Sequence, residues 1–270
     1  KTSRGKRECV MDERMSQEHY ELMGGYLSSI MDIGELLLKY GAEVSRVEDT
    51  MGRLCKAYGF VRADVFTITS SIIATVTLPD ERSITQTRRI KERVTDLGKV
   101  ARVNALSRKI CASPCGLREL QDQIQAIWKA PGVPDWLNLA MYSMISAALS
   151  VFFGGGWMDG CAAALSGLVL FATLQFSASL KLNSIIQTMI CSAITALAVL
   201  LLVRLGIGRQ PDKIMIGNIM LVIPGIQFTT ALRDMINGDT ISGLLNMSEA
   251  VLKAISVAMG FAVVLIVGGG

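Results

Sequence analysis

The chain has 270 residues, of which 51% are hydrophobic and 19% are charged, and its formal net charge is only +4. Of its 27 basic and 23 acidic residues, only 11 lie in Leu137–Gly270, where the apolar runs are too long for a soluble core. The mean hydropathy of +0.43 excludes a wholly soluble protein and is typical of a polytopic membrane protein with one water-facing domain. We therefore expect an α-helical integral membrane protein with an N-terminal α/β cytosolic domain.

The start of the chain carries no secretory signal, because Lys1–Arg14 is polar and lacks the apolar region that such a signal requires. The six cysteines are scattered along the chain and make a poor disulfide framework. This favours a reducing, cytoplasmic setting for the N-terminal domain. We expect a flexible segment at residues 1–18, a cytosolic α/β domain at 19–135 and a transmembrane helical domain at 136–270.

The water-facing part alternates between helical and strand patterns. Apolar residues recur at helical spacing before Gly41, which favours a helix end, and β-branched residues are dense after Gly59. The last helix predicted in this part, Gly116–Trp128, has one apolar face, which suits packing on the domain or lying at the membrane surface. The predicted helices are Tyr20–Tyr40, Glu43–Tyr58, Lys91–Cys111 and Gly116–Trp128, and the predicted strands are Val65–Thr69, Ser71–Leu78 and Ser83–Ile90.

Residues that could support enzyme chemistry are few. The only histidine is His19, so a nucleophile such as Ser45 has one candidate base, and that base is poorly placed. Cys111 and Cys115 form half a zinc site at best, and no Gly-rich phosphate loop of the Walker type is present. We expect no catalytic residues, no metal and no cofactor. The protein would then be a membrane transporter driven by a gradient. The alternative is a membrane-anchored hydrolase or a regulatory scaffold.

A charged run marks the second predicted helix. Glu43, Arg46 and Glu48 lie with Asp49 and Arg53 on one amphipathic surface. Most such runs are solvated faces with weak charge pairs. The functional alternative is a gate, in which Glu43, Arg46 and Glu48 contact the mouth of the helix bundle.

The second half of the chain contains about five transmembrane helices by the length test of roughly 20 apolar residues per span. Five spans after a cytoplasmic N-terminal domain place the C-terminus outside, although three basic residues then flank an outside loop, against the usual charge bias. The predicted spans are Leu137–Phe153, Trp157–Leu180, Ser184–Val203, Lys213–Leu232 and Leu245–Val267.

The fourth span is interrupted by Pro224 and Gly225, with Asn218, Gln227 and Thr229 nearby. Proline removes a helical hydrogen bond, and backbone groups freed at membrane depth must find other partners. Such a break with polar neighbours indicates a substrate site, whereas the alternative is a simple kink. At the end of this span, Arg233 and Asp234 form an ionisable pair that is either an anchor at the membrane surface or part of the gate.

Three stretches of the sequence resemble the threonine/serine exporter family, and the resemblance extends over nearly the whole chain from about Met23. The first is Gly41–Met51, with the sequence GAEVSRVEDTM. The second is Leu221–Gly225, LVIPG, followed by Ala231–Asp239, ALRDMINGD, and later by Gly243. The third, Gly154–Gly160, is similar to the first external loop of the family.

The resemblance implies export of small hydrophilic metabolites, either threonine/serine-type amino acids or small dicarboxylates. The chain resembles the split layout of the family, as in the larger subunit of the bacterial succinate exporter pair. That layout implies a small polytopic membrane subunit as partner, an oligomeric assembly, the cell inner (cytoplasmic) membrane as location and no nucleic-acid partner.

Overall fold

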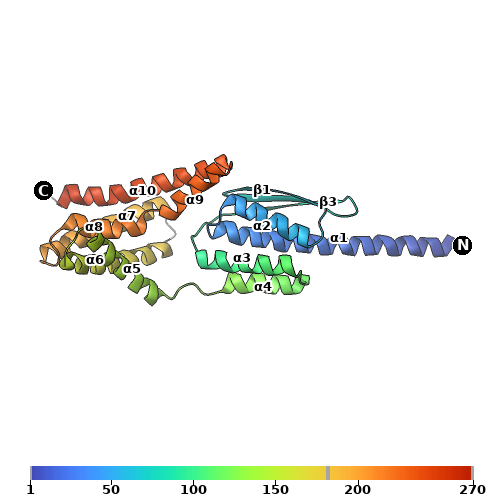
Figure 1. The fold of residues 1–270 in the computed structure, drawn as a ribbon, viewed down its shortest axis with the longest axis horizontal. Coiled ribbons are helices and arrows are strands. Elements are labelled where there is room, and N and C mark those ends of the chain that lie inside the picture. Colours follow the sequence, from blue (N-terminus) through green and yellow to red (C-terminus); the bar gives the residue numbers. More distant parts are fainter. Residues whose placement is uncertain (1, 181–182, 269–270) are drawn as a thin grey trace. The chain divides into compact units, whose positions relative to one another are not determined.

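The computed structural model describes residues 2–180 and 183–268, and their side chains from Gln17 onward. The chain forms two compact units, shown in Figure 1. The N-terminal unit consists of Lys1–Ala130 and Thr230–Asn246, and the helical unit consists of Pro131–Thr229 and Met247–Gly270. The sequence analysis assigned Thr230–Asn246 to the transmembrane domain and linked it to the N-terminal domain only through the predicted gate.

The N-terminal unit contains a three-stranded antiparallel sheet of order β1-β2-β3. One face of the sheet packs on α1 and α2, and α3 and α4 pack on the opposite side of α1 (Figure 1). The elements are α1 (Thr2–Lys39), α2 (Val44–Ala57), β1 (Arg62–Ile68), β2 (Ser71–Thr77), β3 (Ser83–Arg89), α3 (Leu97–Ala112) and α4 (Leu117–Lys129).

The core of this unit follows from the period of its apolar residues. In β2, alternate residues Ile72, Ala74 and Val76 are buried, because successive strand side chains point to opposite faces of the sheet. The apolar face of α4 also joins this core, so it packs on the domain. As predicted, glycines end the first two helices: Gly41 and Gly59 have φ angles of +94° and +84°, which favour glycine.

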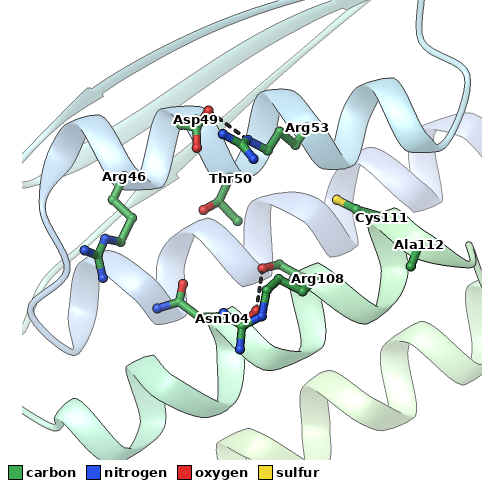
Figure 2. A pocket seen from close by; sticks show the side chains of 9 residues that line it. Arg46, Asp49, Thr50, Arg53, Asn104, Arg108, Cys111 and Ala112 are labelled. Carbon is green, nitrogen blue, oxygen red and sulfur yellow. Dashed lines mark hydrogen bonds and ion pairs between the residues drawn. The ribbon is translucent and has the colours of Figure 1, made fainter.

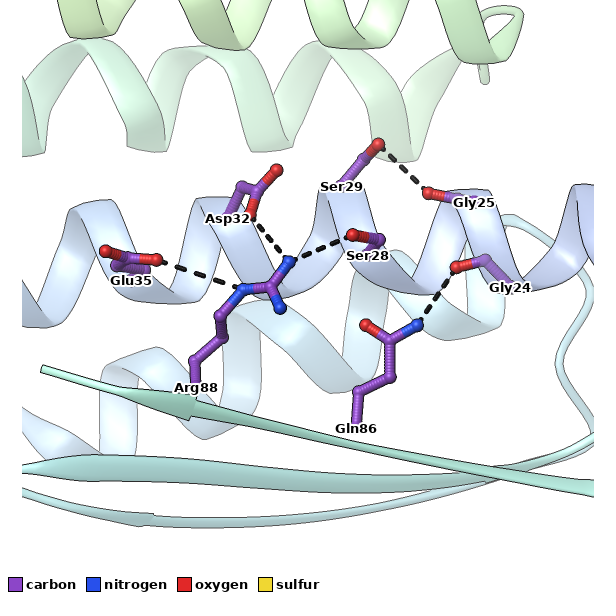
Figure 3. Close-up of polar contacts among 8 residues, drawn as sticks. All are labelled: Gly24, Gly25, Ser28, Ser29, Asp32, Glu35, Gln86 and Arg88. Carbon is purple, nitrogen blue, oxygen red and sulfur yellow. Dashed lines mark hydrogen bonds and ion pairs between the residues drawn. The ribbon is translucent and has the colours of Figure 1, made fainter.

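Polar contacts attach the sheet to α1 (Figure 3). The guanidinium of Arg88 on β3 lies 3.1 Å from the carboxylate of Asp32 and donates to Ser28 Oγ at 2.9 Å. It also lies 3.9 Å from Glu35, whose pKa is raised above its usual value, chiefly by burial. These contacts fix the edge strand β3 on the central helix of the unit.

The helix predicted from Lys91 begins only at Leu97, so the first part of that prediction was wrong. Asp96 caps α3, because its carboxylate accepts a hydrogen bond from Lys99 N at 2.9 Å. Before the cap, Val94 N donates to Lys39 O at 2.8 Å, so this segment runs along the end of α1. At the N-terminus, α1 already begins at Thr2, within the segment 1–18 that we expected to be flexible.

Three helices of the described chain are long and apolar enough to cross a membrane, namely α6, α7 and α10, and a bent pair, α8 with α9, is the fourth candidate. The predicted α-helical membrane class is thus supported, whereas the count of about five spans is not established. The helices are α5 (Asp135–Phe152), α6 (Trp157–Ser179), α7 (Ser184–Arg204), α8 (Pro211–Val222), α9 (Gly225–Ile236) and α10 (Thr240–Gly268).

Small residues allow the helices of the second unit to approach closely. A Cβ atom at Gly260 of α10 would lie 2.7 Å from Ser192 Cβ of α7, so only glycine fits at this crossing. Buried Asp159 at the start of α6 accepts hydrogen bonds from the backbone N–H groups of Gly156, Arg209 and Gln210, at 2.8, 2.6 and 2.9 Å. One carboxylate therefore holds two loops of this unit together.

Candidate functional site

The end of α9 is joined to the start of α2 within the N-terminal unit. The guanidinium of Arg233 forms an ion pair with Glu43, the residue that precedes α2. The carboxylate of Asp234 accepts a hydrogen bond from Val44 N at 3.3 Å. The N–H groups in the first turn of a helix lack partners within that helix, so a carboxylate at this position satisfies one of them and interacts favourably with the helix dipole.

Asp234 is only 1% exposed and continues into a chain of buried polar contacts. Its second oxygen accepts a hydrogen bond from Asn246 Nδ2 of α10 at 3.3 Å, and Asn246 Oδ1 accepts one from Arg93. Asn237 Nδ2 completes the connection by donating to Ser45 Oγ at 3.2 Å. We refer to these residues as the Asp234 cluster: Glu43, Val44, Ser45, Arg93, Arg233, Asp234, Asn237 and Asn246.

The structure thus brings three of the five predicted gate residues together, namely Glu43, Arg233 and Asp234. Arg46 lies at the edge of this group, with its guanidinium 3.9 Å from the Glu43 carboxylate. Glu48 is engaged elsewhere, because its carboxylate accepts a hydrogen bond from Thr67 N of β1 at 2.7 Å. Burial raises the pKa of Glu48, and the nearby Asp239 adds to this shift.

Asn246 and Arg93 were not among the predicted site residues. Arg93 lies in an irregular segment that was predicted to be helical, and Asn246 is one of several polar residues near the start of the last predicted span. Either could have been noticed only as a polar residue next to apolar sequence, which is a weak signal.

The predicted substrate residues fall into separate groups in the helical unit. Asn218 of α8 is fully buried, and its amide bonds Ser146 Oγ of α5 and Ser166 Oγ of α6, both at 2.8 Å. It also donates to Ile214 O at 3.0 Å. Two of these three contacts join α8 to α5 and α6, and the third satisfies the remaining amide hydrogen within α8.

The break at Pro224 and Gly225 bends α8 and α9 by 50°. Proline has no N–H for the carbonyl of Met220, and Gly225 N donates to Ile223 O at 2.8 Å instead of to Leu221 O. Thr229 donates to Gly225 O within α9 at 3.0 Å and is otherwise exposed. The break therefore deprives two carbonyls of their usual helical donors.

Gln227 of α9 has a charged partner that the sequence analysis did not select. The Lys253 ammonium of α10 lies 3.4 Å from Gln227 Oε1 and 2.7 Å from the carboxylate of Glu249. Ionisable residues inside an apolar helix are costly and mark functional positions by default. The signal for Lys253 was present in the sequence as a pair of charges within the last apolar run.

Comparison with known proteins identifies the family of the chain. The family profile described as "Putative threonine/serine exporter" matches residues 28–268. The chain is 22% identical over 239 residues to the threonine/serine exporter of Corynebacterium glutamicum, covering 85% of this chain and 48% of that protein. It is 25% identical over 240 residues to the "Probable succinate transporter subunit YjjP" of Escherichia coli (strain K12), covering 87% of this chain and 92% of that subunit.

The chain therefore spans about half of the Corynebacterium protein but almost all of the Escherichia coli subunit. It also covers 43% of the "Probable threonine/serine exporter" of Mycobacterium tuberculosis (strain H37Rv), at 20% identity. No solved structure matches the chain significantly. Because the profile covers most of the chain, including both stretches that meet in the Asp234 cluster, the resemblance noted in the sequence is confirmed and the protein belongs to the threonine/serine exporter family.

Proposed function

We propose that this protein is the large subunit of a two-subunit, gradient-driven exporter of small hydrophilic metabolites, either threonine/serine-type amino acids or small dicarboxylates. The observation that carries the proposal is the family match over residues 28–268. The two-subunit arrangement is supported by the near-complete coverage of a relative named as a transporter subunit. The partner would be a small polytopic membrane protein in the same inner membrane, with the N-terminal unit in the cytoplasm.

The substrate would bind near Gln227 and Lys253. Every candidate substrate carries at least one carboxylate, and a lysine ammonium inside an apolar helix pair provides its counter-charge. In the structure Glu249 neutralises Lys253 at 2.7 Å, so a substrate carboxylate would compete with Glu249 for the ammonium. Gln227, at 3.4 Å from the same ammonium, would add a neutral polar contact.

The break between α8 and α9 would bind the end of the substrate that lies away from Lys253, or a coupling cation. The carbonyls of Met220 and Leu221, which lack their usual helical donors, are acceptors for an ammonium group or a cation. Pro224, Gly225 and Thr229 would then shape this end of the path, while the buried Asn218 holds α8 on its neighbours.

The Asp234 cluster would transmit movement between α9 and α2. Because Asp234 bonds the first turn of α2 and Asn246 of α10, α9 cannot shift without breaking contacts on both sides. Such a latch is suited to a gate whose ion pair, Glu43 with Arg233, opens and closes during transport.

The test is an efflux measurement in cells that express this chain with and without a candidate small membrane subunit. Cells loaded with threonine, serine or succinate should release one of these faster only when both proteins are present, and the tagged chain should copurify with its partner. Lys253→Met should reduce efflux by about tenfold or more, as expected for one lost charge-assisted contact.

Lys213→Met is the matched control, since Lys213 lies at the start of α8 and pairs with Asp212. It removes the same charge and should leave efflux near the wild-type rate. If no metabolite leaves faster in the presence of both proteins, the proposed function is wrong. If both lysine variants transport normally, export stands but the assignment of Lys253 to the substrate fails.

A further inference from the structure

A cavity of about 560 Å³ lies between α2 and α3 in the N-terminal unit, and Arg46 is the one predicted gate residue among the described residues that line it. Figure 2 shows Arg46 and Arg53 on α2 across from Asn104, Arg108 and Cys111 on α3. This volume falls within the range of roughly 300–1,000 Å³ that is usual for small-molecule sites. The lining consists of Arg46, Asp49, Thr50, Arg53, Asn104, Ser107, Arg108, Cys111 and Ala112.

The lining has an excess of positive charge. Three arginines face one carboxylate, and that carboxylate, Asp49, is held by Arg53 at 2.9 Å. Arg46 has only a long contact of 3.9 Å with Glu43. Within the described part of the chain, no carboxylate pairs with Arg108. The cavity thus offers two guanidinium groups, one from each helix, that can bind an anion: that of Arg108 and that of Arg46, which has only the long contact with Glu43.

The polar neighbours of these arginines suit a small oxyanion. The side chains of Thr50 and Asn104 supply hydroxyl and amide donors in the same cavity. Guanidinium groups present paired N–H donors that match the oxygens of a carboxylate or a phosphate. Because Arg46 and Arg108 lie on opposite walls, a ligand with two anionic groups could contact both.

We propose that this cavity binds a small organic anion with two or more carboxylate or phosphate groups, at a site separate from the transport path. Arg46 and Arg108 would hold the anionic groups, and Asn104 and Thr50 would hydrogen-bond them. The site also has a means of influencing the gate, because Arg46 lies beside Glu43, which pairs with Arg233. This regulatory consequence rests on the proposed transport function, whereas binding itself does not.

Cys111 gives a local readout, because its thiol lines the cavity and its side chain is exposed. The full chain, purified in detergent, is treated with iodoacetamide, and alkylation of Cys111 is followed by peptide mass spectrometry. Since partial desolvation raises the pKa of this thiol, the reaction is run at mildly alkaline pH. Citrate and inorganic phosphate are the probes, and sodium chloride at equal ionic strength is the control.

We expect citrate, phosphate or both to slow alkylation of Cys111 while chloride does not, and the stronger probe shows whether carboxylate or phosphate is preferred. Arg108→Ala should raise the half-protecting concentration by about tenfold or more, as for loss of one charged hydrogen-bond partner. Arg108 is exposed and without an ion pair in the described chain, so this variant should fold. Arg102→Ala is the matched control, because Arg102 lies on α3 but lines a different groove.

The proposal is overturned if neither probe protects Cys111, or if Arg102→Ala weakens protection as much as Arg108→Ala. A second arm places the chain in nanodiscs of phosphatidylglycerol or of phosphatidylcholine. If phosphatidylglycerol alone protects Cys111 and neither soluble probe does, the ligand is a lipid headgroup and the free anion is excluded. None of these measurements requires transport, so they can fail or succeed independently of the proposed function.

Discussion

At the residue scale, Asp234 is the position at which charge, burial and the family sequence meet. Its two oxygens accept from Val44 N and from Asn246 Nδ2, so Asp234→Asn would place an amide donor against one of these donors. A buried group left without a partner costs about 1–3 kcal/mol. We expect the variant to be expressed but less stable, with efflux reduced several-fold. Thermal unfolding of the purified protein and an efflux assay check both effects.

The control for this variant is Asp212→Asn, because the Asp212 side chain is 63% exposed at the start of α8. A sharper comparison is the exchange Asp234→Asn with Asn246→Asp. In that double variant Asp at 246 can accept from Arg93 and from the new amide, while the amide oxygen at 234 accepts from Val44 N. We expect it to regain most of the stability and efflux. Normal efflux in Asp234→Asn alone would show that this residue anchors α9 on its neighbours and is not part of a gate.

Residue types indicated some of these roles before their contacts were known. Arg233 and Asp234 were recognisable because they are charged at the end of an apolar span, and Glu43 because it belongs to a charged run. Their pairing was not predictable, since 190 residues separate Glu43 from Arg233 along the chain. Lys253 was not selected, although its charge interrupts the last apolar run and Gln227 lies beside it in the structure.

At the element scale, the sequence predicted the helices and strands of the N-terminal unit closely, because glycines end the first two helices and β-branched residues mark the strands. It failed for residues 91–96, where the Asp96 cap and contacts with the end of α1 override helical propensity. It also predicted one span where the structure has α8 and α9 at 50°. The break was located correctly, but its angle depends on packing that no local pattern encodes.

The break itself is expected to depend on Pro224. A residue before proline avoids helical angles, and Ile223 indeed has φ −60° and ψ 129°. Pro224→Ala would remove this restriction and supply an N–H for the carbonyl of Met220, so the two helices should straighten. We predict a folded protein with strongly reduced efflux, and a separate, substrate-dependent loss in Gln227→Ala. Efflux of several substrates, together with the circular dichroism spectrum, would measure both changes.

Pro211→Ala is the matched control for the break. Pro211 is at the first position of α8, where proline replaces an N–H that has no helical partner in any case. Efflux in this variant should therefore remain near the wild-type rate. If Pro224→Ala and Gln227→Ala also transport at that rate, the break is only a packing kink, and the substrate site lies elsewhere in the bundle or on the partner subunit.

At the scale of the whole molecule, the Asp234 cluster constrains the membrane topology. Asn237, in the connection between α9 and α10, bonds Ser45 of the N-terminal unit, so this connection and that unit lie on the same side of the membrane. The chain between them must then cross the membrane an even number of times. It contains α6 and α7, which are long and apolar enough to cross, together with α5 and the bent pair.

An even number leaves two arrangements, since α5 and the bent pair must either both cross or both remain on one side. With 18 residues, α5 is about 27 Å long, slightly less than the roughly 30 Å of the hydrocarbon core. We favour crossing by both, because neither α5 nor α8 has a charged residue beyond its first turn. With the N-terminal unit in the cytoplasm, as proposed, this arrangement gives five crossings in total and places the α5–α6 connection outside.

The two arrangements differ in where they place Trp157, at the α5–α6 connection, whose side chain is 87% exposed. A membrane-impermeant thiol reagent on intact cells should label Trp157→Cys, in a background with Cys161→Ser, and should not label Cys111 until the cells are permeabilised. Cys55 is a poor reporter, because its thiol is buried and its pKa is raised to about 12. Labelling of Cys111 in intact cells would reverse the orientation. Protection of both positions would mean that α5 and the bent pair do not cross, and Arg204 and Arg209 would then flank a cytoplasmic loop, as the positive-inside rule prefers.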